Sequence, residues 1–220
     1  MDSLTIRDTT VELPVFDDDV ELTPITSFDE VTSDFLFEGA SLRSLDLGHV
    51  RLLVGRVKEL RTAHMAFTDV RADSVEFSGC DFSSLSWTAS KLTRVRFAAC
   101  KLLGAQFADL TLEHVVFANC KLDYATMERL KAAGPVVFSD CSLVEAKYEA
   151  CDLSGVALDG CSLDLTEFAR GTYRGCDLRG NDLSSARGVA NLHGVVIDRA
   201  QTLQLAEALA ADLGVTFGDE

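Results

Sequence analysis

The sequence predicts an all-β fold, a right-handed quadrilateral β-helix that is followed by a short C-terminal α-helix. Three observations predict it: large apolar residues recur every five positions, small residues recur two positions before them, and similar residues recur every twenty positions. A period of five fits neither the 3.6 residues of an α-helical turn nor the two-residue alternation of a flat strand. It fits a chain that turns a corner every five residues and closes a four-sided coil after twenty.

The five-residue series of large residues runs from Phe37 to Leu183. It slips by one residue at Ala133-Gly134-Pro135, which we interpret as a one-residue bulge at a corner. The series is weakest over residues 53–74, where Thr62 and Ala72 occupy its positions, so we expect irregular coils there.

The twenty-residue period predicts columns of similar side chains stacked in adjacent coils. One side of the coil gives a phenylalanine column beside a valine column, namely Phe77, Phe97, Phe117 and Phe138 beside Val75, Val95, Val115 and Val136. The next side gives a cysteine column, namely Cys80, Cys100, Cys120, Cys141 and Cys161. Both columns stay in phase across Gly134-Pro135 if one residue is skipped, which supports the bulge.

The repeat divides the chain into three parts: an acidic segment or cap over residues 1–36, the β-helix over residues 37–187, and a C-terminal cap over residues 188–220. Each coil of a solenoid contacts only its neighbours, so both ends need covering. In the last part Asp198, with Gln201 three residues later, is typical of a helix N-terminus. The apolar residues of that helix are Leu203, Leu205, Ala206, Leu209, Ala210 and Leu213. We expect Val215-Thr216-Phe217 to form a final strand.

Three units carry a sharper motif, Cys151-Asp152-Leu153-Ser154-Gly155, Cys176-Asp177-Leu178-Arg179-Gly180 and Asn181-Asp182-Leu183-Ser184-Ser185. They resemble the pentapeptide-repeat family, whose units read roughly Ala-Asp-Leu-x-x, and the resemblance covers about two thirds of the chain. It implies the quadrilateral β-helix and a C-terminal element that pairs two molecules into a rod-shaped dimer. The residues that would form this homodimer interface are Leu203, Leu205, Leu209, Leu213 and Phe217. The resemblance also implies a specific function for some members, which mimic duplex DNA, bind the type II topoisomerase DNA gyrase, and protect it from quinolones or natural-product poisons.

Composition restricts the class of protein. The 220 residues carry a net charge of −15, which argues against direct nucleic-acid binding and leaves open a protein partner with a basic surface. The chain has neither a run of 18 apolar residues nor a basic, apolar signal at its start, so we expect no membrane segment and a cytoplasmic location.

Catalytic chemistry is not predicted. All seven cysteines occupy small inward positions, where we expect reduced, buried thiols. The four histidines are scattered over different sides, so no metal site and no cofactor are expected. No nucleophile and base recur together, and the glycines fall at corners rather than in a phosphate-binding loop.

The negative charge is unevenly distributed along the chain. Residues 1–38 hold eleven acids and one base, whereas residues 39–187 are almost neutral, with a net charge of −1. One side of the β-helix exposes acids that are candidates for partner binding: Asp46, Asp69, Asp109, Glu128, Glu149 and Glu167. Another side exposes mostly bases: Arg51, Arg71, Lys91, Arg94, Lys131 and Arg174. A mixed, solvated surface is the simpler interpretation of both.

Two functional hypotheses therefore remain. The first is a DNA mimic that binds DNA gyrase through the acidic side, although full mimicry of duplex DNA needs about one negative charge per 1.7 Å of length. The second is a scaffold or regulator that binds another protein, whose identity nothing in the sequence indicates.

Overall fold

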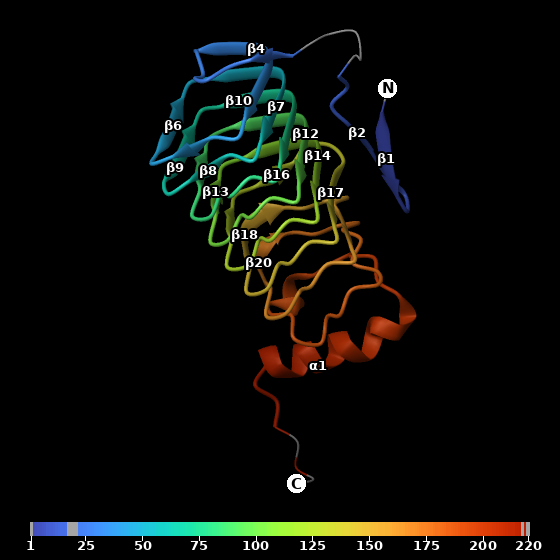
Figure 1. Ribbon diagram of the computed structural model, residues 1–220. Helices are drawn as coiled ribbons and strands as arrows, with labels where there is room; N and C mark the ends of the chain where they lie inside the picture. Colours follow the sequence, from blue (N-terminus) through green and yellow to red (C-terminus); the bar gives the residue numbers. More distant parts are fainter. Residues whose placement is uncertain (1, 17–21, 217, 219–220) are drawn as a thin grey trace.

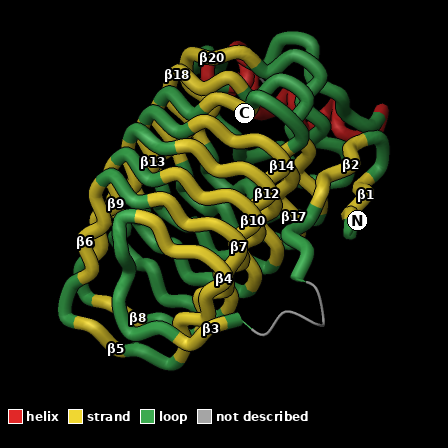
Figure 2. Tube along the Cα trace, turned by 90° about the horizontal axis from the view of Figure 1, so that it is seen from above, coloured by secondary structure: helices red, strands yellow, loops and turns green. Residues whose placement is uncertain are grey.

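The body of the computed structural model, which describes residues 2–16, 22–216 and 218, is a parallel β-solenoid of about seven turns (Figure 1). Residues twenty apart pair in adjacent coils; Phe77, for example, pairs with Val57 on one side and Phe97 on the other. Figure 2 shows the coils stacked one against the next, with the helix at one end. The predicted fold class, a quadrilateral β-helix with one C-terminal helix, is confirmed.

Four sides, named here A to D, repeat in every coil. Side A is centred on the column of Phe77 and Phe97, side B on Phe82 and Leu102, side C on Trp87 and Phe107, and side D on Leu92 and Leu112. Long strands cover sides D and A together: β4 (Val31–Glu38), β7 (Arg51–Lys58), β10 (Arg71–Ser78), β12 (Lys91–Ala98) and β14 (Thr111–Ala118). Side C holds the short strands β6 (Leu45–Gly48), β9 (Met65–Thr68), β11 (Ser86–Thr88), β13 (Gln106–Ala108) and β15 (Thr126–Glu128).

Side B is built mainly from turns. Within the described part of the chain, β5 (Ser41–Leu42) and β8 (Arg61–Thr62) form the single strand pair there, and single bridges such as Lys101 to Lys121 join the coils that follow. In the C-terminal coils the ladders of sides D, A and C continue as β16 (Lys131–Ala132), β17 (Val136–Ser139), β18 (Lys147–Asp152), β19 (Ala157–Asp159) and β20 (Glu167–Thr172).

The predicted columns form the core. The rings of Phe77, Phe97, Phe117 and Phe138 stack with centroids 5.0, 4.7 and 4.7 Å apart and planes within 9° of parallel. All seven cysteines are free and buried, and the thiols of six of them donate to main-chain carbonyl oxygens, as Cys100 Sγ does to Phe77 O at 3.4 Å. Stacking similar side chains in register allows the interior to pack closely.

The bulge lies where the slip predicted it. Leu112 pairs with Ala132, twenty residues later, but Val115 pairs with Val136, twenty-one residues later. The expected irregularity of residues 53–74 is wrong, because β7 and β10 pair in full register and Ala72 is buried. Main-chain hydrogen bonds between coils keep the backbone regular even where a column holds a small side chain.

The first coil begins at Val31, six residues before the boundary drawn from the sequence, and Thr32 is its first inward residue. The preceding strand β3 (Thr23–Pro24) pairs with β4, and Phe28 stacks on Phe37 with centroids 4.8 Å apart. These residues cover the N-terminal end of the core.

A hairpin of β1 (Ser3–Ile6) and β2 (Thr9–Glu12) lies along side A beside β14 and β17 (Figures 1 and 2). Val11 is buried against Val116, Val137 and Ala157, which point outward from side A. The segment predicted as an acidic segment or cap therefore has two roles: the hairpin covers a side, and residues 22–30 cover the end.

At the C-terminal end the coils continue past residue 187, through the 3₁₀ turn η1 (Val189–Asn191), to Val196, which bridges to Asp177. The predicted helix start is confirmed: the N–H of Asp198 donates to Oε1 of Gln201 at 2.6 Å, and η2 (Arg199–Gln201) leads into α1 (Thr202–Asp212). The final strand is wrong at Val215 and Thr216, which pair with no strand, and Phe217 lies outside the described residues. No helix among the described residues is long and apolar enough to cross a membrane.

Candidate protein-binding surfaces

The six predicted acids of side C project outward from six coils, and the coil of Trp87 contributes none of them. The ladder places Ala108 beside Glu128, and Glu128 beside Glu149. Identical charges stacked at a coil spacing of about 4.8 Å repel one another, so bases between them stabilise the arrangement.

Arginines and lysines of the same side supply those charges. Arg129 donates from Nε and Nη2 to the two oxygens of Asp109, at 2.7 and 2.8 Å, and it also pairs with Glu128. Arg170 pairs with Glu149, while Lys147 bridges Glu149 and Glu167 at 3.3 Å to each.

The two remaining acids face histidines. His49 Nδ1 lies 2.8 Å from Asp69, and His64 Nε2 lies 3.8 Å from Asp46. All six predicted side C acids thus have a basic or titratable neighbour, so side C presents ion pairs rather than a row of free carboxylates.

The pKa values of the paired acids follow from these contacts. Hydrogen bonds from Arg129 hold the pKa of Asp109 below its ordinary value. Those from Arg170 and Lys147 do the same for Glu149. Both groups therefore remain charged at neutral pH, with their charges compensated by the adjacent bases.

The positive charges of side D are only partly neutralised by ion pairs. Lys91 pairs with Glu113 at 2.9 Å, and Arg94 pairs with Asp73. The other predicted bases, Arg51, Arg71, Lys131 and Arg174, have no ion pair among the described residues. Side D is therefore the more cationic surface of the solenoid.

The C-terminal helix leaves apolar side chains in solvent. Leu203 and Leu213 are 69% and 68% exposed, and Leu209 is 37% exposed. Leu205, in contrast, packs against the end of the core. Of the predicted interface residues, the structure thus places three on an open surface and one in the fold, while Phe217 is outside the described residues.

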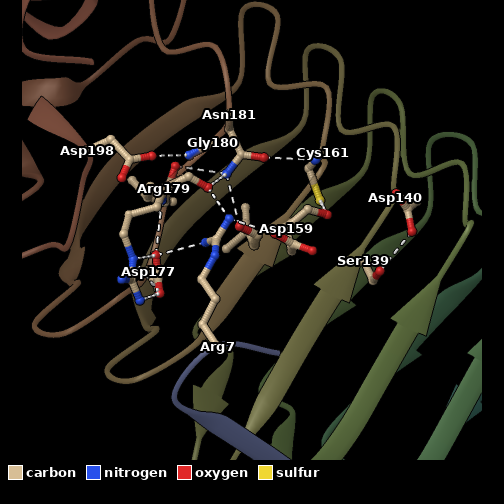
Figure 3. A network of polar contacts seen from close by, with 12 residues as sticks. Arg7, Ser139, Asp140, Asp159, Cys161, Asp177, Arg179, Gly180, Asn181 and Asp198 are labelled. Atoms are coloured by element: carbon tan, nitrogen blue, oxygen red, sulfur yellow. Dashed lines mark hydrogen bonds and ion pairs between the residues drawn. The ribbon is translucent and has the colours of Figure 1, made fainter. Parts of the chain in front are cut away.

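The hairpin is fixed to side A by a polar network (Figure 3). Arg7 donates to Asp177 at 2.9 Å, to Asp159 at 2.6 Å and to the carbonyl oxygen of Arg179 at 2.5 Å. Arg179 in turn pairs with Asp177 and with Asp8. The pKa of Asp177 is lowered, because these cations outweigh the opposing effect of burial.

The thiols are structural. Burial raises the pKa of Cys151 to about 11 and that of Cys176 to about 12, so both are protonated at neutral pH. Within the described ranges no three His, Cys, Asp or Glu side chains are grouped so that they could hold a metal ion.

Side B carries outward residues that the sequence analysis did not single out. Tyr124 is 61% exposed, and Leu103, Val144 and Leu165 are partly exposed. The signal was present in the repeat itself, since these are apolar residues at outward positions of units whose inward positions were already assigned.

Three comparisons with known proteins bear on this chain. Among solved structures, a trypsin-treated variant of QnrB1, described as a plasmid-mediated fluoroquinolone resistance protein, is similar at 17% identity, covering 81% of this chain and 100% of that one, with a TM-score of 0.49. HetL, described as a pentapeptide repeat protein involved in heterocyst differentiation regulation from the cyanobacterium Nostoc sp. strain PCC 7120, is 16% identical, covering 75% of this chain and 86% of that one, with a TM-score of 0.27. No curated protein sequence matches the chain.

The family comparison agrees with the repeat. A family model described as "Pentapeptide repeat region" matches residues 90–168. The same five-residue period and the same coil register extend beyond both ends of that region, from β7 to the bridge between Glu167 and Arg187. Residues 90–168 are therefore a pentapeptide repeat region, and the flanking coils continue the same kind of repeat.

Proposed function

We propose that this protein is a non-enzymatic binding protein that presents a rigid four-sided surface to a protein partner. The observation that supports this most directly is that large apolar side chains remain in solvent although the core is already filled. Tyr124, Leu203 and Leu213 are each more than 60% exposed. Exposed aromatic and aliphatic residues on a rigid scaffold are typical anchors of protein interfaces.

DNA gyrase is the specific partner that we propose to test first. The reason is the resemblance of the repeat units to a family in which some members mimic DNA, together with the net charge of −15. The ion pairs of side C weaken the hypothesis that this side mimics DNA, since a DNA mimic needs acids whose charge is not neutralised by neighbouring bases. Mimicry would then depend on acids elsewhere, and a scaffold for a different protein is the alternative.

A supercoiling assay with purified DNA gyrase, with and without a fluoroquinolone, tests the specific form. Inhibition by this protein, or rescue from the drug, at low micromolar concentration would support gyrase as the partner. The triple substitution of Asp109, Glu128 and Glu149 by lysine then tests side C. If the triple variant acts like the unaltered protein, side C is not the binding surface; if neither protein has an effect, the partner is not gyrase.

A homodimer through α1 is part of the proposal. Two such helices could bury Leu203, Leu209 and Leu213 against each other, because these residues are exposed while Leu205 is held by the fold. Glutamate at Leu203 and Leu213 should give monomers in sedimentation velocity. Val31→Glu is a matched control, since Val31 is 52% exposed at the opposite end of the solenoid. A double variant that still sediments as a dimer would exclude this interface.

The proposal includes a cytoplasmic location, where buried thiols remain reduced. Fractionation of cells that express the protein, followed by thiol labelling under denaturing conditions, would test both points together.

A further inference from the structure

Side B carries an alternating surface over four successive coils. Each coil there exposes two adjacent turn positions, and the apolar residue changes position from one coil to the next. The apolar members are Leu103, Tyr124, Val144 and Leu165, and the acidic members are Asp123, Glu145 and Asp164. Main-chain hydrogen bonds fix this order: Tyr124 N donates to Val144 O at 2.9 Å, and Glu145 N to Asp164 O at 2.8 Å.

Tyr124 is not required by the fold at this position. Its backbone is left-handed, with φ of 60°, and the equivalent residue of the preceding coil is Gly104, with φ of 62°. A Cβ atom at Gly104 would meet no atom within 4 Å, so the space beside the tyrosine is open. The ring is therefore exposed, and the space above Gly104 beside it is open to a partner side chain.

The acids of the alternating surface differ from those of side C. No described Lys, Arg or His forms an ion pair with Asp123, Glu145 or Asp164. Two of them are instead oriented by neutral donors. Asp123 accepts from the hydroxyl of Ser142 and from the N–H of Val144 at 3.1 Å, and Asp164 accepts from the hydroxyl of Ser185 at 3.0 Å. These carboxylates are held in place without an ion-pair partner among the described residues.

The coil spacing sets the shape of the complementary partner. Adjacent coils lie about 4.8 Å apart, and one turn of an α-helix rises about 5.4 Å. A helix lying along the solenoid axis would thus present about one turn to each coil, and over four coils it would drift out of register by only about 2 Å. An extended strand fits less well, because residues on one face of a strand repeat every ~6.6 Å.

We propose that the alternating surface of side B binds a basic amphipathic α-helix of a partner protein, and this inference rests on the proposed protein-binding function. Lysine or arginine on the helix meets Asp123, Glu145 and Asp164, and apolar residues of the same face pack on Tyr124 and its apolar neighbours. A cation above the Tyr124 ring gains further attraction from the π-face. The protein's own α1 does not fit, since Thr202–Asp212 contains no basic residue.

The test uses a synthetic helical peptide of about sixteen residues with lysine and leucine interleaved on one face, labelled for fluorescence anisotropy. Two control peptides have the same length: one carries glutamate in place of lysine, and one places lysine and leucine on opposite faces. We expect the first peptide to bind at least tenfold more tightly than either control. Equal binding of all three peptides, or no binding of the first, would overturn the inference.

Substitutions then locate the binding site. Tyr124→Gly copies the glycine that the preceding coil has at the same position, so it relieves the left-handed tyrosine and should raise the melting temperature while weakening peptide binding at least tenfold. The double variant Glu145→Gln, Asp164→Asn should weaken peptide binding to a similar extent. The difference in affinity from the unaltered protein should grow as the salt concentration is lowered, because charge attraction is then screened less. Asp34→Asn, at an exposed acid of the first coil, is the matched charge control and should leave peptide binding unchanged. If Tyr124→Gly binds the peptide like the unaltered protein, side B is not the site.

The gyrase assay separates this inference from the proposed function. If Tyr124→Gly affects supercoiling as the unaltered protein does and the peptide does not bind, the proposed function stands and side B has no part in it. If the peptide binds through Tyr124 but gyrase is unaffected, the side B inference stands and the partner is another protein with a basic helix.

Discussion

The inward and outward columns of the same coils follow different rules. Inside, Phe97 lies between Phe77 and Phe117 with ring planes within 9° of parallel, because a closed coil leaves one shape of space at each level. Outside, Asp109 on side C meets an arginine, whereas Glu145 on side B lies beside an exposed tyrosine. The backbone fixes where an outward side chain starts but not which residue it must be. Stability therefore resides in the inward columns, and the proposed partner binding would depend on the outward ones.

The largest effect should come from breaking an inward column. Phe97→Ala removes a fully buried ring from the middle of the stack and should lower the free energy of unfolding by about 3–5 kcal/mol. Chemical denaturation followed by the fluorescence of Trp87, the single tryptophan, whose ring centroid lies 6.1 Å from that of Phe97, measures the loss.

Phe97→Leu is the matched control, since Leu158 occupies the same column in a later coil. It should cost clearly less than the alanine variant because most of the volume is kept. Equal losses for the two variants would mean that cavity volume does not set the cost in this column.

A smaller effect is expected where the hairpin meets side A. Arg7→Ala removes the three hydrogen bonds to Asp177, Asp159 and the Arg179 carbonyl, and should weaken docking of the hairpin by about 2 kcal/mol. Hydrogen exchange of the amides of β1 and β2 should accelerate while exchange in β10 and β12 is unchanged. Arg43→Ala, at an exposed arginine with no ion pair among the described residues, is the control. Equal protection of β1 and β2 in all three proteins would show that the network does not hold the hairpin.

Two tyrosines sharpen the comparison with a matched pair of inward substitutions. The hydroxyl of Tyr148 is buried and has no hydrogen-bond partner among the described residues, whereas the hydroxyl of Tyr173 donates to the carbonyl oxygen of Ala169 at 3.0 Å. Tyr148→Phe should raise the free energy of unfolding by about 1 kcal/mol, and Tyr173→Phe should lower it by about 1 kcal/mol. Denaturation curves of the two variants measure both free energies of unfolding. If the two substitutions changed the free energy of unfolding in the same direction, the hydrogen bond of one hydroxyl and the lack of one at the other would be contradicted.

The sequence was sufficient for the inward columns because burial selects residues by size at fixed spacing. The phenylalanine and cysteine columns, the bulge before Val136 and the start of the C-terminal helix were all predicted in this way. The hairpin was missed because Leu4, Val11 and Leu13 pack on side A rather than in the repeat, and no period links them to Val116 or Val137. The final strand failed because Val215 and Thr216 find no neighbouring strand edge beyond the helix.

The outward surface was predicted only in part. Counting charges by side correctly placed Asp109, Glu128 and Glu149 on side C, but a count does not show which base reaches which acid. Arg129 neutralises two of them because it sits one residue after Glu128 and twenty after Asp109. A count of charges does not single out side B, because its acids are no more numerous than those of side C. What distinguishes them is their position beside Tyr124 and their lack of ion-pair partners among the described residues.

The smallest expected effect concerns the titration of Asp109. Arg129 lowers the pKa of this carboxyl group, so the pair stabilises the folded state above the unfolded pKa of about 4, and this contribution is lost as the pH falls through the lower, folded pKa. Arg129→Ala should return the pKa of Asp109 towards its ordinary value and remove that part of the acid dependence. Carboxyl NMR titration of both proteins measures the change. Asp182, whose pKa is lowered by hydrogen bonds with Ser184, serves as the internal reference and should not move. An unchanged Asp109 pKa in the variant would mean that the ion pair is not formed in solution, and side C would then regain a free carboxylate on which a DNA-mimicking surface could be built.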